Sequence, residues 1–526
     1  MSETGAEPIP AAQEIAAGYT TEGLSLQLGT VVVDGATDPA ASVNLPLATL
    51  NRHGLVAGST GSGKTKTLQL IAEQLSANGV PVVMADVKGD LSGLALPGKE
   101  GDKIAQRAEQ TKDDWTATAF PTEFVSLGAN GTGVPVRGTV ASFGPILLAK
   151  ILGLNETQES SLGLIFRWAK DKNLDLVDLK DLRAVIGHLT GDSGKAELKA
   201  LGGVSSASAG VILRAVANLE GDGGDVFFGE PEIDVNDLQR IAPDGRGVIT
   251  LFELGDQSAR PVLFSTFLMW VLSRLFQTLP EIGDVEKPKL VFILDEAHLL
   301  FADASKAFVS QIEQTVKLIR SKGVSVIFCT QLPTDIPNEV LSQLGARVQH
   351  ALRAFTPEDQ KALARTAKTY PTSKVYDIQS ALTSAGIGEA IVTVLSETGS
   401  PTPVAWTRLR APRSFMGAIG ADAIRGSAQH SALWAKYAQA QDRPSAYEAL
   451  NQPPAPAAPE TAPQSEDSAP AAPKPERAQK AARAEKEEPG FVEKVMENQA
   501  VKGFMRNLGS TLGREISKSL FGKRRR

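Results

Sequence analysis

The chain has 526 residues, of which 42% are hydrophobic and 22% charged, and this near-average composition excludes wholesale disorder. Its formal net charge of -6 excludes a uniformly basic nucleic-acid binder but leaves room for a local basic channel. The single cysteine, Cys329, excludes an intramolecular disulfide. Neither a signal peptide nor a run of about 18 apolar residues is recognisable, so we expect a cytoplasmic protein, with peripheral membrane contact left open.

The amino-terminal segment, residues 1–22, is polar and rich in Ala, and it predicts a flexible arm. Residues 24–33 carry β-branched and alternating apolar residues that predict one or two strands. A short apolar strand over residues 53–57 runs into a glycine-rich loop, and the apolar spacing over residues 64–77 predicts a helix. Another apolar strand covers residues 81–87. This order is a βαβ unit, which implies a parallel sheet covered on both faces.

Residues 146–240 have a different character, because apolar residues at helical spacing recur through them and predict a helical insertion between strands. Strands and helices alternate again over residues 241–416. The strands predicted there cover residues 247–254, 289–295, 324–330, 347–354, 389–395 and 403–409, and the helices cover residues 258–279 and 304–321. The last two of these strands are expected to finish the sheet.

The composition changes after a predicted helical extension over residues 417–448. Residues 449–489 are rich in Pro and Ala without an apolar period, which predicts a disordered linker. Residues 490–526 regain apolar residues at helical spacing and carry nine Lys or Arg against three Glu, so they predict a basic amphipathic helix. Contact with an anionic membrane, with nucleic acid or with a protein partner stays open for this helix, as does a weakly folded, solvated tail.

The glycine-rich loop has the spacing G-x-x-x-x-G-K-[ST]. Its residues are Gly58, Ser59, Thr60, Gly61, Ser62, Gly63, Lys64 and Thr65. Glycines at these positions let backbone N–H groups turn toward an anion, and the next helix adds its positive amino-terminal end. We expect Lys64 to reach the β- and γ-phosphates of ATP and Thr65 to ligate Mg²⁺. Residues 23–145 are therefore interpreted as the phosphate-binding half of an ATPase core; a glycine turn without a ligand is the alternative.

Residues 241–416 are interpreted as the other half of that core, because an apolar strand within them ends in two carboxylates. Asp295 is expected to order Mg²⁺ through its water shell, and Glu296 to take a proton from, or orient, the attacking water. A carboxylate directly after the Mg²⁺-linked aspartate favours hydrolysis over phosphate transfer. Gln331 ends the next strand at the same carboxyl edge, where it would sense the γ-phosphate or hold the water. An ordinary strand-end cap is the alternative for Gln331.

Five further polar residues are weaker candidates. Asp86 ends a strand at the same edge, where a supporting role competes with a simple turn. Arg320, Arg347 and Arg353 are candidates for an arginine finger, in their own subunit or a neighbour's. Arg347 and Arg353 are six apart on one predicted strand and would share a face, whereas Arg320 could equally serve the dipole of its helix. His298 is interpreted either as a residue that contacts the site or as a structural cap of the next helix.

Four stretches of this sequence resemble a known superfamily. They are HGLVAGSTGSGKT, ADVKGDLSGL, LVFILDEAHLLF and RSKGVSVIFCTQLPTDIPNEVLSQLGARVQHALRAFTP. These stretches are similar to the HerA/FtsK superfamily of motor ATPases and, more narrowly, to the bacterial HerA-like proteins of the YjgR type. The resemblance covers about residues 14–416. It implies an α/β fold: a RecA-like P-loop NTPase of the additional-strand, catalytic-glutamate type, with a mostly parallel sheet flanked by helices and here a helical insertion.

The resemblance also implies a function. Lys64, Thr65, Asp295, Glu296 and Gln331 match the functional motif of the family, with ATP and Mg²⁺ as ligands. Such proteins often assemble as rings of six and pump DNA, or in a secretion-linked branch DNA and protein. The archaeal HerA proteins carry a β-barrel domain ahead of the core, and the segment ahead of the glycine loop is too short for it. A DNA motor is the leading hypothesis; a ring ATPase for protein or a secretion or membrane complex, and a nucleotide-dependent scaffold, are the alternatives.

Overall fold

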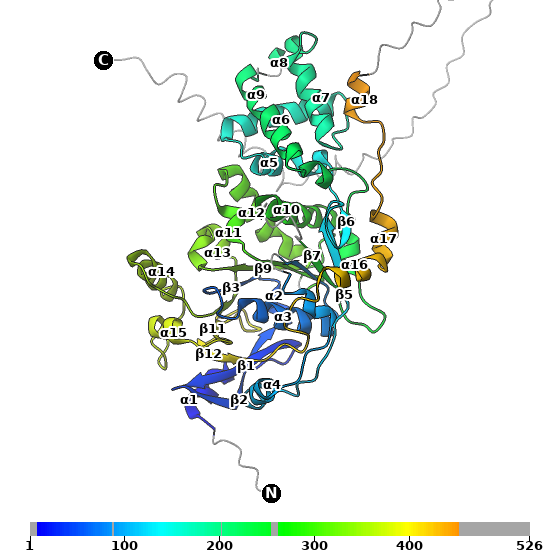
Figure 1. Cartoon of the computed structure of the whole chain (residues 1–526). Helices are drawn as coiled ribbons and strands as arrows, with labels where there is room; N and C mark the ends of the chain where they lie inside the picture. Colours follow the sequence, from blue (N-terminus) through cyan, green and yellow to red (C-terminus); the bar gives the residue numbers. More distant parts are fainter. Residues whose placement is uncertain are drawn as a thin grey trace, which may run out of the picture. The chain divides into compact units, whose positions relative to one another are not determined.

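One large sheet organises the part of the chain that the structure describes (Figure 1). Its strands are β1 (Ser25–Val33), β2 (Ala36–Pro46), β3 (Gly54–Ala57), β4 (Val82–Asp86), β5 (Thr122–Leu127), β6 (Val134–Val136), β7 (Ile249–Glu253), β8 (Leu290–Leu294), β9 (Val324–Thr330), β10 (Ala346–Gln349), β11 (Glu389–Thr393) and β12 (Ala405–Leu409). They lie in the order β2-β1-β12-β11-β10-β3-β9-β8-β4-β7-β5-β6. Neighbours from β10 to β6 are parallel, and those from β2 to β10 are antiparallel. The expected α/β class with a mostly parallel sheet is confirmed.

The computed structural model describes residues 8–86, 89–200, 202, 204–253, 261–283 and 285–451, which all lie in the unit Met1–Ala455. The α-helices of this part are α1 (Pro10–Ala17), α2 (Leu47–Leu50), α3 (Lys64–Ala77), α4 (Asp102–Gln110), α5 (Val140–Ile151), α6 (Glu156–Asp171), α7 (Leu179–Thr190), α8 (Lys195–Ala200), α9 (Ser206–Gly221), α10 (Pro261–Thr278), α11 (His298–Phe301), α12 (Lys306–Ile319), α13 (Asn338–Leu341), α14 (Pro357–Ala367), α15 (Ile378–Ser384), α16 (Ala421–Gln429), α17 (Ala432–Tyr437) and α18 (Ala446–Asn451). The predicted linker and basic helix, from residue 452 on, lie outside the described residues.

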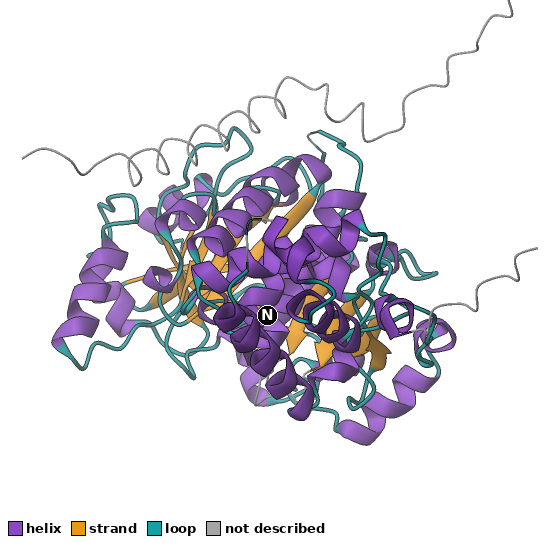
Figure 2. Ribbon diagram, turned by 90° about the horizontal axis from the view of Figure 1, so that it is seen from above, coloured by secondary structure: helices purple, strands orange, loops and turns teal. Residues whose placement is uncertain are grey.

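Helices cover both faces of the parallel part of the sheet (Figure 2). Successive strand residues point to opposite faces. Leu55 and Ala57 of β3 therefore join the apolar core that holds Trp270 of α10, whereas Val56 joins the core that holds Ile71 of α3. The parallel strands β3, β4, β8 and β9 are buried along their whole length, which explains their almost continuous apolar sequences.

The expected helical insertion is present between β6 and β7 as α5 to α9. Apolar residues at helical spacing, such as Leu182, Val185 and Ile186 on α7, form its own part of the core. The long apolar stretch that follows folds as α10, a buried helix of the core. Within the described ranges, none of the helices combines the length and apolar character that crossing a bilayer requires.

Three details differ from the expectations. The segment expected to be a flexible arm contains α1, whose Ala12 and Ile15 are buried against the sheet. The strand expected over residues 347–354 ends at Gln349 instead, because the chain leaves the ladder there. The pair β11 and β12 does not finish the sheet, since β1 pairs with β12 and carries β2 beyond it.

Candidate active site

The glycine loop joins β3 to α3 and closes on itself. Gly58, Gly61 and Gly63 all have positive φ angles, of 153°, 79° and 112°. A Cβ atom at Gly58 would lie 2.5 Å from the Cβ of His350, so only glycine fits there. The Ser62 hydroxyl donates to the carbonyl of Ser59 at 2.7 Å. The loop is therefore preformed, with the open side of Gly61 left for a ligand.

Lys64 is the first residue of α3, and its ammonium group lies at the mouth of the loop. It donates to the carbonyls of Gly58 at 2.7 Å and of Ser59 at 3.3 Å. Thr65 follows in the first helical turn and is partly exposed. Among the described residues no group of three or more His, Cys, Asp or Glu could hold a metal. A Mg²⁺ ion that takes one hydroxyl, water and phosphate oxygens needs no such group.

His350 supports the loop from behind, and the sequence analysis missed it. Its backbone N–H donates to Ala57 at 2.7 Å, and its Nε2 lies 2.8 Å from the hydroxyl of Thr67 on α3. Burial, together with the positive charge of Lys64, lowers the pKa of His350 to about 4. The imidazole is therefore neutral at pH 7, and its contacts hold the start of α3 against the end of β10. A lone histidine at a strand end gave no signal for this role.

The two predicted carboxylates follow β8 in a tight turn. The N–H of Glu296 donates to Oδ1 of Asp295 at 2.9 Å, and that of Ala297 donates to the carbonyl of Cys329 at 2.8 Å. Glu296 has a φ of 49°, an unfavourable conformation for a residue with a side chain. Burial and the nearby Asp295 raise the pKa of the Cys329 thiol well above its usual value. The turn is thus tied to β9, the strand between β8 and the glycine loop.

His298 is the first residue of α11, and its Nδ1 lies 3.4 Å from Oε2 of Glu296. Gln331 directly follows β9 and is exposed at the carboxyl edge of the sheet. Because β9 lies between β3 and β8, the same edge carries the glycine loop, Gln331 and the turn with Asp295. The main chain thus brings the three predicted parts to one edge.

Asp86 also ends its strand at this edge, in register with Glu253 of β7. Oδ2 of Asp86 accepts from the N–H of Leu91 at 2.9 Å. Burial raises the pKa of Asp86 to about 6, and burial with the neighbouring Asp86 raises the pKa of Glu253 to about 8. The sequence analysis missed Glu253, because nothing in one strand indicates which strand will lie beside it.

The three candidate arginines do not lie together. The N–H of Arg353 donates to the hydroxyl of Ser59 at 3.0 Å, so Arg353 lies beside the glycine loop. Arg347 is the second residue of β10 and Arg320 precedes β9, which places both at the amino edge, opposite the loop. The expectation that Arg347 and Arg353 share one strand face is wrong. Arg320 and Arg347 instead line a cavity of about 710 Å³, with Arg52 and Lys317.

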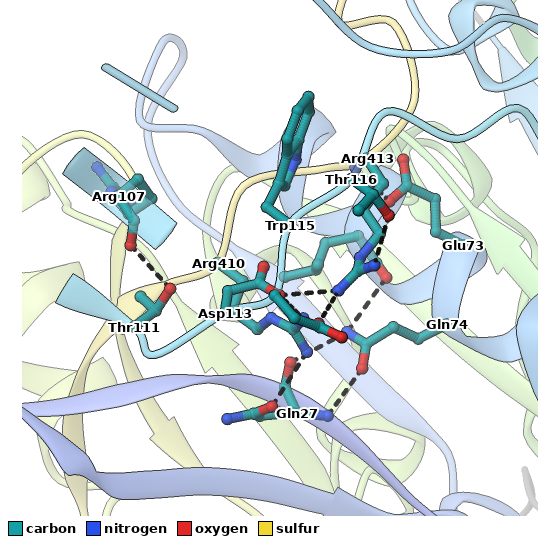
Figure 3. Close-up of polar contacts among 12 residues, drawn as sticks. Gln27, Glu73, Gln74, Arg107, Thr111, Asp113, Trp115, Thr116, Arg410 and Arg413 are labelled. Carbon is teal, nitrogen blue, oxygen red and sulfur yellow. Dashed lines mark hydrogen bonds and ion pairs between the residues drawn. The ribbon is translucent and has the colours of Figure 1, made fainter. Parts of the chain in front are cut away.

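The outer face of α3 is held by the segment after β12 (Figure 3). The buried carboxylate of Glu73 accepts from the backbone N–H groups of Arg413 at 2.8 Å and Ser414 at 2.9 Å. Burial raises the pKa of Glu73, and these hydrogen bonds oppose that shift. Asp113, which is 1% exposed, accepts from Arg410 and, at 2.9 Å, from Arg413. The helix that starts with Lys64 is therefore held at Glu73 by the segment after β12.

Comparisons with known proteins agree with this geometry. The family model described as "Helicase HerA-like C-terminal" matches residues 32–526. The chain belongs to this HerA-like family. As a HerA-like protein it is a P-loop NTP hydrolase of the motor ATPase type. A search of curated proteins finds no match.

Solved structures of TrwB share the fold of this HerA-like chain. The bacterial conjugative coupling protein TrwBdeltaN70 in an unbound form is 15% identical, with a TM-score of 0.50, over 78% of this chain and 95% of that chain. The plasmid coupling protein TrwB in complex with ADP and Mg²⁺ is 14% identical, with a TM-score of 0.51, over 76% and 94% of the two chains. VirB4 of Thermoanaerobacter pseudethanolicus is 15% identical, with a TM-score of 0.47, over 74% and 98%.

Proposed function

We propose that this HerA-like ATPase couples ATP hydrolysis to movement on DNA, as a helicase-like or translocase-like motor. The observation that carries the ATPase part of the proposal is the meeting of the glycine loop after β3, Asp295 and Glu296 after β8, and Gln331 after β9 at one edge of the sheet. DNA as the substrate is supported by the description of the matching family as helicase-like. That edge is where ligands bind in open parallel sheets.

In the proposed site, residues 58–65 bind the phosphates of ATP through backbone N–H groups. Lys64 would turn from its loop carbonyls to the β- and γ-phosphates, Thr65 would ligate Mg²⁺, and Asp295 would order the ion through its water shell. The ion neutralises charge on the phosphates when it is bound. The complex of TrwB with ADP and Mg²⁺ supports this ligand pair for the fold.

Glu296 is the proposed base. It would accept the proton of the attacking water, and its tight turn keeps the carboxylate beside Asp295 without a long flexible loop. Gln331, exposed at the end of β9, would orient the water or sense the γ-phosphate. His298, within 3.4 Å of Glu296, is suited to orienting that carboxylate. Asp86, at the end of β4 next to β8, would support the part of the site where Asp295 orders Mg²⁺.

Arg320 and Arg347 lie at the opposite edge, so a phosphate that either one reaches would belong to a second copy of the chain. We propose a hexameric ring, the assembly that the family resemblance implies, in which one subunit would complete the site of the next. Arg353 is the candidate within the same subunit, because its backbone contacts the glycine loop.

A ring ATPase that acts on protein or on a secretion or membrane complex is the second candidate function. Residues 490–526 would be the contact segment, and the cytoplasm would be the location.

The test is the ATPase rate of the full chain, measured with and without duplex DNA at low salt, with the particle mass read on the same sample. A DNA motor should hydrolyse ATP faster with DNA, and the mass should correspond to several copies. An unchanged rate with DNA would contradict DNA as the substrate. Full hydrolysis by a monomer would contradict the ring.

A further inference from the structure

The two most exposed large apolar side chains of the described residues are Phe355 and Ile387, at 84% and 77% exposed. Phe355 follows β10, and Ile387 precedes β11. Single exposed apolar side chains are common on protein surfaces, so their position relative to a site decides whether they can bind a ligand. Both belong to segments that contact the glycine loop, so both are carried next to the site proposed for the nucleotide.

The segment before Phe355 runs along the first half of the loop. The N–H of Ser59 donates to the carbonyl of Ala351 at 2.9 Å, and the N–H of Arg353 donates back to the Ser59 hydroxyl at 3.0 Å. The N–H of Phe355 then donates to Oδ2 of Asp359 at 3.1 Å, within the cap of α14. The backbone that carries the Phe355 ring is therefore fixed at both ends.

The segment at Ile387 contacts the second half of the loop. The N–H of Gly388 donates to the carbonyl of Ser62 at 3.4 Å, and a Cβ atom at Gly63 would lie 3.4 Å from that same nitrogen. The carbonyl of Gly388 accepts from Nη1 of Arg107 at 3.0 Å. Ile387 is thus presented on a fixed turn beside the loop.

The order of the strands gives the bound nucleotide a direction. Glu296 and Gln331 follow β8 and β9, which both lie on one side of β3, so the γ-phosphate must point to that side. β10 and β11 lie on the other side of β3. Since the base and the γ-phosphate are opposite ends of one extended molecule, the base end points toward Phe355 and Ile387.

Resting on the proposed function, we propose that Phe355 and Ile387 form the subsite for the purine base of the nucleotide. The Phe355 ring stacks on the base, and Ile387 offers a second apolar surface beside the loop. An aromatic ring stacks on the face of a base and makes no hydrogen bonds with its edges, so the contact does not discriminate between bases. The subsite therefore increases the affinity for ATP and for GTP equally. It does not increase the affinity for a ligand that consists of phosphates only.

The experiment compares equilibrium binding of ATP, GTP and inorganic triphosphate to the full-length protein with Mg²⁺. Phe355→Ala should weaken both nucleotides by the same factor, roughly 5-fold to 100-fold, which is the range for loss of one stacking contact. Its affinity for inorganic triphosphate should stay unchanged, because triphosphate has no base. Phe355→Tyr should retain nucleotide binding, and Ile387→Ala should weaken it in the same selective way.

Ile241→Ala is the matched control, since Ile241 is also an exposed apolar residue, at 51%, in the segment before β7. It should change none of the three affinities. If Phe355→Ala weakens triphosphate as much as ATP, or changes only the particle mass, the subsite is wrong. Lys64→Ala separates this from the proposed function: it should weaken all three ligands, and unchanged binding there would reject the phosphate site itself.

Discussion

Asp86 and Glu253 end neighbouring parallel strands in the same register, so two buried carboxyl groups point to one side of the sheet. Oε1 of Glu253 has no hydrogen-bond partner within the described ranges. With the pKa of Glu253 raised to about 8 and that of Asp86 to about 6, the pair holds a proton at neutral pH.

We predict that Glu253→Gln flattens the pH dependence of stability. The pKa of Glu253 is about 8 in the folded chain and close to the ordinary 4.5 when unfolded, so the folded state binds the extra proton between these values. The contribution of Glu253 to the free energy of unfolding is fully present below pH 4.5 and is lost as the pH rises toward 8. Urea unfolding at a series of pH values measures this, and an unchanged slope in the variant, or the same flattening in exposed Glu100→Gln, would contradict it.

Glu296→Gln should lower the hydrolysis rate by about 10²-fold to 10⁴-fold, because the amide cannot accept a proton from water. ATP affinity should stay near the wild-type value, since Glu296 is proposed to act on the attacking water and not to bind the phosphates. Steady-state hydrolysis and equilibrium binding on the same preparation check both halves. A variant that still hydrolyses ATP at the wild-type rate would show that another group is the base.

Mixing of variants tests whether an arginine acts across subunits. Arg320→Ala or Arg347→Ala should lower hydrolysis by roughly 10³-fold or more if that residue is the finger. Adding copies with Lys64→Ala, which are inactive alone, should restore part of the rate, because their intact arginine faces a neighbour's intact loop. Exposed Arg365→Ala on α14 is the control and should have the full rate. Full rates for both Arg320→Ala and Arg347→Ala would leave Arg353 as the candidate.

Asp113→Ala should destabilise the protein by about 3–5 kcal/mol, because it leaves Arg410 and Arg413 largely buried without their shared carboxylate. The neighbouring Asp114→Ala is the matched control, since that side chain is 92% exposed although it contacts both arginines. Its unfolding midpoint should hardly move. Equal midpoints for the two variants would show that the network adds little.

The local parts of the site could be predicted from the sequence. A glycine loop between a strand and a helix, and an apolar strand that ends in Asp295-Glu296, are patterns of consecutive residues, and the structure contains both elements. The helical insertion was equally predictable, because its longer helices each have an apolar period.

What could not be predicted depends on pairing between distant segments. The register of Asp86 with Glu253, the contact of His350 with Thr67 and the position of β1 next to β12 each join residues far apart in the chain. Arg347 and Arg353 do not lie on one strand, because β10 ends at Gln349 and the chain then runs beside the glycine loop. No single-segment pattern contains that turn.

The bond between Glu73 and Ser414 has a consequence during synthesis. The two residues are 341 positions apart, so a ribosome that adds about 5–20 residues per second needs roughly 20–70 s to deliver the second after the first. Throughout that interval the nascent chain carries α3 without the anchor that Glu73 finds in the segment after β12. The ATP site would thus be among the last parts of the core to mature, and the unfinished chain would be a natural client for chaperones.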